Sequence, residues 1–172
     1  MKQINHIIGG KEVVSTSGRS ADVYNPATGK VTAQVNLASV AEVDSAVAVA
    51  KEAFESWQDA SLARRSAVMF RFRDLVDTHQ HDFAAALTAE HGKVLSDSLG
   101  EVMRGLENIE YACGLAEHLK GSFSNQASTE LDVYSFRQPL GVVAGITPFN
   151  FPAMVPMWMY PNAIAAGNTF IL

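Results

Sequence analysis

Residues 141–172 read GVVAGITPFNFPAMVPMWMYPNAIAAGNTFIL, and their pattern indicates the class of fold. The segment GVVAGI is short and apolar, which is typical of a strand buried on both faces of a parallel sheet. Pro152 suits the first turn of a following helix. After the connection AIAAGN, the segment NTFIL reads as the next buried strand. A strand, a helix and a strand in this order predict the opening unit of a parallel α/β sheet.

Four helices are predicted before that unit. Apolar residues recur at three- and four-residue spacing from Ser39 onward, and Ser39 and Glu42 have the spacing of a capping box. The first helix is therefore expected to begin near Val40. The second is expected after Ser61, with its arginines on a solvated face. These arginines are Arg64, Arg65, Arg71 and Arg73.

The third and fourth helices are placed by their ends. Gly92 suits the left-handed position that follows a helix, which predicts a third helix over residues 80–91. Ser96 or Ser98 can cap the fourth helix, and Gly121 can end it. All four helices precede the first buried strand.

Two extended stretches complete the predicted architecture. Residues 4–37 alternate short strand-like runs with Gly, Pro and Asn turns, which indicates a small antiparallel ribbon. Residues 129–140 are rich in β-branched and aromatic residues and indicate an exposed strand. The expected divisions are thus residues 1–128 with the ribbon and four helices, 129–140 with the exposed strand, and 141–172 with an incomplete sheet.

Composition narrows the function. The chain has 172 residues, 48% of them apolar, and a formal net charge of -5, which fit a globular protein with a hydrophobic core. The 13 lysines and arginines are scattered, so nucleic acid is not an expected partner. The start, MKQINHIIGGKEVV, has too short an apolar run for a signal peptide or a membrane span. A cytoplasmic protein without a membrane partner is expected.

The cysteine and histidines indicate no metal site. Cys113 is the single cysteine, which excludes an internal disulfide and an all-cysteine metal site. It lies in a helical pattern, where a buried small hydrophobic side chain is the expected role and a reactive thiol is the alternative. His79 and His81 would point to different sides of a helix, which argues against a metal pair.

Asn150 is the candidate site residue. It follows GVVAGI, at the carboxyl end of a predicted parallel strand, which is where open α/β sheets place ligands. Its side chain offers an NH2 donor on a short stem, and Pro148 and Pro152 restrict the backbone around it, which suits a preorganised donor. An Asx-type turn, or a cap for the following helix, explains the same pattern equally well. Both interpretations stay open on the residues alone.

These motifs resemble the aldehyde dehydrogenase superfamily across essentially the whole chain. The runs that carry the resemblance are PLGVVAGITPFNFP, AIAAGNTFIL, YNPATGKV, FESWQDASLARRSAVMFRFRDLV and EHGK. Within the superfamily, FNFPAMVPMWMYPNAIAAGNTFIL and EVMRGLENIEYACG are most similar to the CoA-acylating methylmalonate-semialdehyde dehydrogenases. The resemblance implies an α/β fold in which an incomplete Rossmann-like parallel sheet follows helices and a β-ribbon. It also makes residues 1–128 part of an NAD-binding domain and 129–140 an oligomerisation strand.

The resemblance implies a role for each matching residue. Asn150 would donate its side-chain NH2 to the oxyanion that forms when a catalytic cysteine attacks an aldehyde. Thr147 and Phe149, together with Asn150, would contact NAD. Arg104 would bind the carboxylate of a semialdehyde substrate.

Arg104 has a simpler interpretation on the residues alone. It lies one helical turn from both Glu101 and Glu107, which favours a surface arginine in an ordinary ion pair. The resemblance shifts the interpretation towards the substrate carboxylate.

The implied reaction is the NAD-dependent oxidation of malonate or methylmalonate semialdehyde to an acyl-CoA with loss of CO2, in a homo-oligomer. A hydrolytic aldehyde dehydrogenase is the alternative. The family's nucleophilic cysteine, general-base glutamate, pyrophosphate-binding turn and ribose-binding lysine match positions beyond Leu172, and Cys113 matches none of them. The chain is therefore expected to be the first part of a longer protein and to be inactive alone. A non-catalytic fragment that only associates is the other alternative.

Overall fold

A computed structural model describes all 172 residues, Met1–Leu172. The helices are α1 (Val40–Trp57), α2 (Leu62–Thr78), α3 (Gln80–His91), α4 (Leu95–Cys113) and α5 (Met154–Ala165), and a short 3-10 helix, η1, covers Leu115–Leu119. The strands are β1 (Lys2–Ile4), β2 (His6–Ile8), β3 (Lys11–Val13), β4 (Ser20–Asn25), β5 (Lys30–Asn36), β6 (Phe123–Ser128), β7 (Leu131–Tyr134), β8 (Val142–Ala144) and β9 (Thr169–Ile171). None of the helices combines the length and apolarity that crossing a membrane requires.

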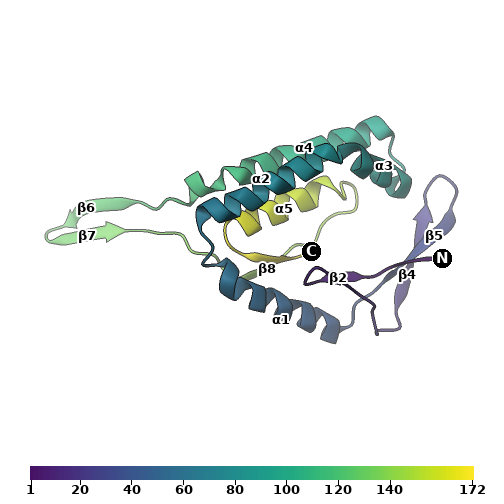
Figure 1. Ribbon diagram of the computed structural model, residues 1–172, viewed down its shortest axis with the longest axis horizontal. Coiled ribbons are helices and arrows are strands. Elements are labelled where there is room, and N and C mark those ends of the chain that lie inside the picture. Colours follow the sequence, from purple (N-terminus) through teal and green to yellow (C-terminus); the bar gives the residue numbers. More distant parts are fainter.

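The β8–α5–β9 unit confirms the predicted strand, helix and strand. β8 and β9 pair in parallel, with Val142 opposite Thr169 and Ala144 opposite Ile171. In Figure 1, α5 lies between these strands and the layer formed by α2 and α4, whereas α1 lies on the other side of the strands. The strands therefore lie between α5 and α1, which is the layering of an α/β fold.

Two details of this unit differ from the prediction. β8 is half-buried rather than buried on both faces, because β9 is its only partner and the pair has no third strand. Helix α5 begins at Met154, so Pro152 precedes the helix instead of occupying its first turn. The first free N–H groups of α5 are bound by a side chain from α4, described below, rather than by a local cap.

The predicted starts of the first three helices are confirmed, and so is the predicted end of the third. Ser39 and Glu42 form the capping box, in which the Glu42 N–H donates to Ser39 Oγ at 3.3 Å and the Ser39 N–H donates to Glu42 Oε2 at 2.7 Å. α1 accordingly begins at Val40. α3 covers the predicted residues, and Gly92 after it has a φ of 86°, in the left-handed region.

Helix α4 differs from the prediction at both ends. It begins at Leu95, and neither Ser96 nor Ser98 caps it. Ser98 is instead buried and shares a 2.8 Å hydrogen bond with Thr88 of α3, so its hydroxyl serves the contact between two helices. The helix ends at Cys113 rather than near Gly121, because the chain turns into η1.

The solvated arginine face predicted for α2 is wrong at Arg65. This residue is buried, and its Nη2 donates to the carbonyl oxygen of Gln58 at 2.6 Å. Gly167 makes room for it, because a Cβ at that position would lie 2.7 Å from Arg65 Cζ. The other three arginines are exposed or half-buried.

The first 37 residues form more than an antiparallel ribbon. β4 pairs with β5 in the antiparallel sense, and so does β2 with β3, as predicted. β1, however, pairs with β5 in parallel. This pairing joins residues about thirty positions apart, with Lys2 opposite Ala33. Turn motifs in the sequence indicate only pairing between neighbouring strands, so they could not predict it.

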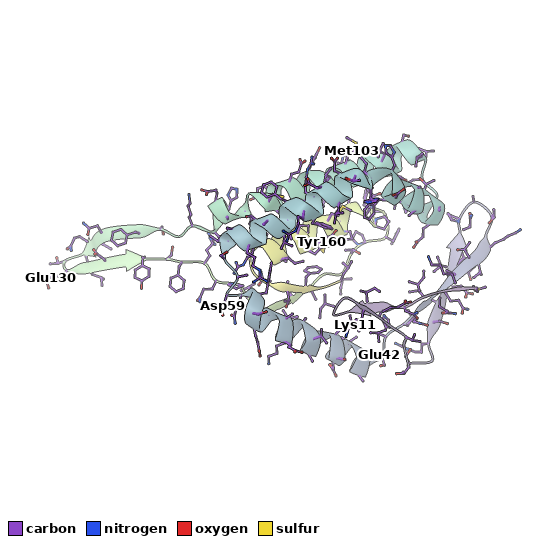
Figure 2. All side chains as sticks on the ribbon, viewed as in Figure 1. Lys11, Glu42, Asp59, Met103, Glu130 and Tyr160 are labelled. Atoms are coloured by element: carbon purple, nitrogen blue, oxygen red, sulfur yellow. The ribbon has the colours of Figure 1, made fainter.

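The predicted exposed strand is one arm of a hairpin. β7 pairs antiparallel with β6, and every residue of both strands is exposed. The hairpin projects from the body of the molecule in Figure 1, and Glu130, labelled in Figure 2, lies at its tip. The predicted division between residues 128 and 129 therefore falls inside one structural element.

Two neighbouring clusters make up the core between the helices. The first joins α2, α4 and α5 through Val76, Val102, Leu106, Ile109 and Met157. The second contains Met69, Ala112, Cys113 and Ala165, which confirms Cys113 as a buried hydrophobic residue. Gly105 of α4 allows the close approach of Met157, since an added Cβ would collide with its sulfur. These contacts hold α5, and hence the loop before it, against α4.

Candidate functional site

The candidate site is the loop that joins β8 to α5, at the carboxyl end of a parallel strand. Its apolar residues face solvent to an unusual degree, and Phe149 is 89% exposed. Thr147 is half-buried, whereas Pro148 and Asn150 are exposed. An exposed aromatic ring at this edge of a sheet is a surface that a ligand can cover.

The Asn150 carboxamide has no partner within the chain. Its side chain makes no hydrogen bond, and it does not cap α5, whose cap position is Ala153 and has no side-chain hydrogen bond. The interpretation of Asn150 as a turn or cap residue is therefore wrong. Only its main-chain oxygen is bound, by Lys93 Nζ at 3.1 Å. The NH2 group thus remains free to donate to a ligand.

A buried ion pair that the sequence analysis missed anchors this loop. Lys93 lies between α3 and α4, and its Nζ forms an ion pair with Glu101 of α4. The Glu101 side chain is 1% exposed and that of Lys93 13%. Glu101 Oε1 accepts from the N–H groups of Ala153 and Met154, at 2.8 Å and 3.1 Å. The carboxylate therefore caps α5 from another helix, where negative charge also suits the helix dipole.

The protonation of Glu101 follows from these contacts. Burial by itself raises the pKa of a carboxyl group, because the charged form loses its hydration. Here the hydrogen bond from Lys93 and those from the Ala153 and Met154 N–H groups outweigh burial and hold the pKa of Glu101 below its ordinary value. Glu101 is therefore a carboxylate at neutral pH.

Arg104 is exposed and forms no ion pair with Glu101 or Glu107. The ordinary ion pair predicted from the helix spacing is therefore absent, and Glu101 is instead buried and bound to Lys93. Arg104 lies one helical turn after Glu101 on α4, a rise of about 4.5 Å. Its free guanidinium thus comes from the element that also holds the Asn150 loop.

Two surface hollows lie away from this loop. A cavity of about 990 Å³ between α1, β2 and β9 is lined mainly by apolar residues. None of Arg104, Thr147, Phe149 and Asn150 lines it. A second hollow lies between α2 and α3. The candidate loop therefore belongs to neither of these two hollows.

Comparison with known proteins gives a consistent result. The profile of the aldehyde dehydrogenase family matches residues 13–172. The malonate-semialdehyde dehydrogenase of Pseudomonas aeruginosa is 49% identical over 172 residues, which are 100% of this chain and 34% of that protein. Malonate-semialdehyde dehydrogenase 3 of Geobacillus kaustophilus is 49% identical over 171 residues, 35% of its length. The chain thus spans about a third of the length of these curated relatives.

Solved structures match over the same portion. A Sinorhizobium meliloti 1021 protein, described as a methylmalonate-semialdehyde dehydrogenase and solved with NAD, superposes with a TM-score of 0.96 at 45% identity. The match covers 100% of this chain and 35% of that one. The methylmalonate-semialdehyde dehydrogenase of Oceanimonas doudoroffii superposes with a TM-score of 0.95 at 47% identity, over 99% and 35% of the two chains.

Proposed function

The chain belongs to the aldehyde dehydrogenase family, and on that premise we propose that it forms the amino-terminal part of an enzyme that oxidises malonate or methylmalonate semialdehyde with NAD. Relatives at 49% identity are named malonate-semialdehyde dehydrogenases. One structural relative with a TM-score of 0.96 was solved with NAD. The proposal concerns the whole protein, since the chain corresponds to about a third of these relatives.

The observation that carries the proposal is the free carboxamide of Asn150. Its NH2 is exposed and unbonded, while its main-chain oxygen is bound by a partly buried cation. The bond to the main-chain oxygen restrains the backbone of Asn150, and the unbonded NH2 can donate to an oxyanion, which supports a role as an oxyanion donor. We assign Asn150 the role of stabilising the oxyanion formed when a thiolate adds to the aldehyde carbon.

The nucleophile has to come from outside these 172 residues. Cys113 is the single cysteine, and it is buried in the helical core. Burial, and next the nearby Glu110 carboxylate, raise the pKa of its thiol. A buried, protonated thiol is a poor nucleophile. Asn150 can assist a thiolate supplied by another part of the protein, but it cannot replace one.

Thr147 and Phe149 are the residues we assign to the cofactor, together with Asn150. The exposed Phe149 ring and the half-buried Thr147 lie at the carboxyl end of β8, which suits a nucleotide cofactor in an open α/β sheet. NAD, when bound, supplies the hydride acceptor of the oxidation. The role of this loop is to present one aromatic surface and one hydroxyl to it.

Arg104 is the residue we assign to the substrate's carboxylate. Its guanidinium has no carboxylate partner in the chain, and a planar fork of N–H donors matches a carboxylate in two parallel hydrogen bonds. The aldehyde at one end of a semialdehyde would then lie near Asn150 and the acid group near Arg104.

Transfer of the acyl group to CoA is the finer part of the proposal. In that reaction the substrate's free carboxylate is lost as CO2 and a proton from solvent takes its place on the adjacent carbon, and the CoA thiol then adds to the thioester carbonyl and expels the enzyme cysteine as a thiolate. In a hydrolytic enzyme, water takes the place of CoA. Chromatographic detection of acyl-CoA in the complete enzyme separates the two, since a hydrolytic enzyme yields only the free acid.

The test of the Asn150 assignment is Asn150→Ala in the complete protein. Loss of one oxyanion donor is expected to lower kcat by about 100- to 1,000-fold. Gln58→Ala removes another exposed carboxamide whose side chain makes no hydrogen bond, and it should leave kcat unchanged. NADH formation followed at saturating aldehyde gives both values. A kcat near that of wild type for Asn150→Ala would exclude the assignment.

A further inference from the structure

The Lys93 side chain touches the candidate loop at two adjacent residues. Its Nζ donates to the main-chain oxygen of Asn150 at 3.1 Å and lies 4.7 Å from the centroid of the Phe151 ring. The first contact is a charge-assisted hydrogen bond, and the second is a cation–π contact. The same ammonium group forms the ion pair with Glu101. One cation therefore binds the carboxamide residue and its neighbour at once.

The Glu101 carboxylate holds the chain just beyond this point. Its second oxygen accepts from the N–H groups of Ala153 and Met154. Pro152, between the two sets of contacts, has no N–H to offer. The ion pair therefore binds main-chain atoms both before and after Phe151 and Pro152, at the start of α5.

A buried ion pair is an inefficient source of stability, because desolvation of the two charges offsets much of their attraction. Packed apolar side chains of similar volume would hold α4 and α5 together at least as well. The pair is instead directed at main-chain atoms of the loop, and those atoms include the carbonyl of Asn150 itself. What the pair supplies is a defined position for the loop.

Resting on the proposed role of Asn150, we infer that Lys93 and Glu101 are positioning residues that fix the backbone of Asn150, so that its carboxamide is held where the oxyanion forms. Neither side chain touches the reacting atoms in this arrangement. Lys93 acts on the Asn150 carbonyl, and Glu101 acts through Lys93 and through the start of α5. The carboxamide remains free because its own backbone, rather than its side chain, carries the restraint.

The test is a double-mutant cycle in the complete protein, with wild type, Lys93→Met, Asn150→Ala and the double variant. A displacement of about 1 Å can cost about 100-fold in rate, so Lys93→Met is expected to lower kcat by about 10- to 100-fold. The KM for the semialdehyde should change by less than about 3-fold, because binding of the ground state does not depend on the oxyanion donor. In the Asn150→Ala background, Lys93→Met should cost less than about 3-fold in kcat, since the group being positioned is gone.

A second measurement reports on the structure of the loop independently of catalysis. Hydrogen exchange at the Ala153 and Met154 amides should accelerate in Lys93→Met and in Glu101→Gln, because both variants weaken the hydrogen bonds from these amides to residue 101. Lys120→Met is the matched control, since it also removes one lysine from a lysine–glutamate ion pair, but this pair is exposed and lies at the end of η1. It should change neither the exchange nor kcat. If Lys93→Met does not fold, Glu101→Gln takes its place in the cycle.

The outcomes separate the two proposals. If Lys93→Met lowers kcat by the same factor in the wild-type and the Asn150→Ala backgrounds, the positioning inference is overturned and the oxyanion role of Asn150 stays intact. Unchanged exchange at Ala153 and Met154 in both variants would overturn it as well. An Asn150→Ala enzyme as fast as wild type would remove the proposed oxyanion role of Asn150 and the positioning inference together.

Discussion

At the scale of single residues, two polar side chains near the same loop are in opposite states. Glu101 is buried, and both of its oxygens have partners. Asn150 is exposed, and its carboxamide has none. The first state is what a buried charge requires to be tolerated, whereas the second leaves the carboxamide available to a ligand. The contrast is the reason to assign anchoring to one residue and chemistry to the other.

Gly167 is a second residue whose identity the structure explains. Its φ of 95° lies in the region that favours glycine, and an added Cβ would lie 2.7 Å from Cζ of the buried Arg65. Gly167→Ala is expected to destabilise the protein by about 2 to 5 kcal/mol, through backbone strain plus steric overlap. Urea unfolding measures the decrease in the free energy of unfolding.

Gly29→Ala is the control for that substitution. Gly29 has a φ of 68°, but a Cβ there would meet nothing within 4 Å, so this variant reports backbone strain alone. The two variants should differ by about 1 to 3 kcal/mol, the usual cost of overpacking. Equal losses would mean that Arg65 moves aside freely.

At the scale of elements, Glu42 joins the start of α1 to the chain before β4. Figure 2 places it at the end of α1 that lies nearest to the amino-terminal strands. Its carboxylate accepts from the Ser39 and Thr16 N–H groups, both at 2.7 Å. These hydrogen bonds, from Ser39 first and Thr16 next, lower the pKa of Glu42 from 4.5 to about 2.

A pH dependence follows from that shift. Because the pKa is lower in the folded state than in the unfolded chain, the carboxylate stabilises the fold above pH 4.5 and loses this effect as the pH falls towards 2. Glu42→Gln should therefore be less stable than wild type at pH 7, and the gap should narrow between pH 4.5 and pH 2. Urea unfolding at several pH values measures the gap. A gap that stays constant down to pH 2 would contradict the assigned hydrogen bonds.

At the scale of the whole molecule, the two strands of the β6–β7 hairpin pack mainly on each other. It extends away from the helices in Figure 1, and all its residues are exposed. Its apolar residues and those just after it are Phe123, Leu131, Val133, Tyr134 and Phe136. A two-stranded ribbon with free edges and apolar side chains is a surface for strand pairing or packing. We propose that it contacts a second copy of the protein in a homo-oligomer.

Val133→Asp is expected to weaken that association, because it places an unpaired charge among apolar side chains. Light scattering after size-exclusion chromatography should show a smaller mass at micromolar concentration. Thr129→Asp adds the same charge at the turn of the hairpin and should leave the mass unchanged. An unaltered mass for Val133→Asp would place the interface elsewhere.

Local pattern alone is enough for much of this molecule. The capping box at Ser39, the left-handed Gly92 and the strand–helix–strand order after Gly141 all depend on residues close together in sequence, and the structure confirms each of them. The family could likewise be identified from contiguous motifs. Asn150 could be singled out because prolines flank it, but its pattern did not decide between a structural and a chemical role.

Packing between distant segments decides the rest. Arg65 is buried because Gly167, a hundred residues further on, leaves space for its guanidinium. Lys93 and Glu101 look like ordinary surface charges in the sequence, and only the docking of α5 against α4 brings them to the Asn150 loop. Periodicity and capping report on the nearest turn of chain, whereas desolvation of a charge depends on every segment packed around it. For this reason the anchor of the candidate site becomes visible only in the folded molecule.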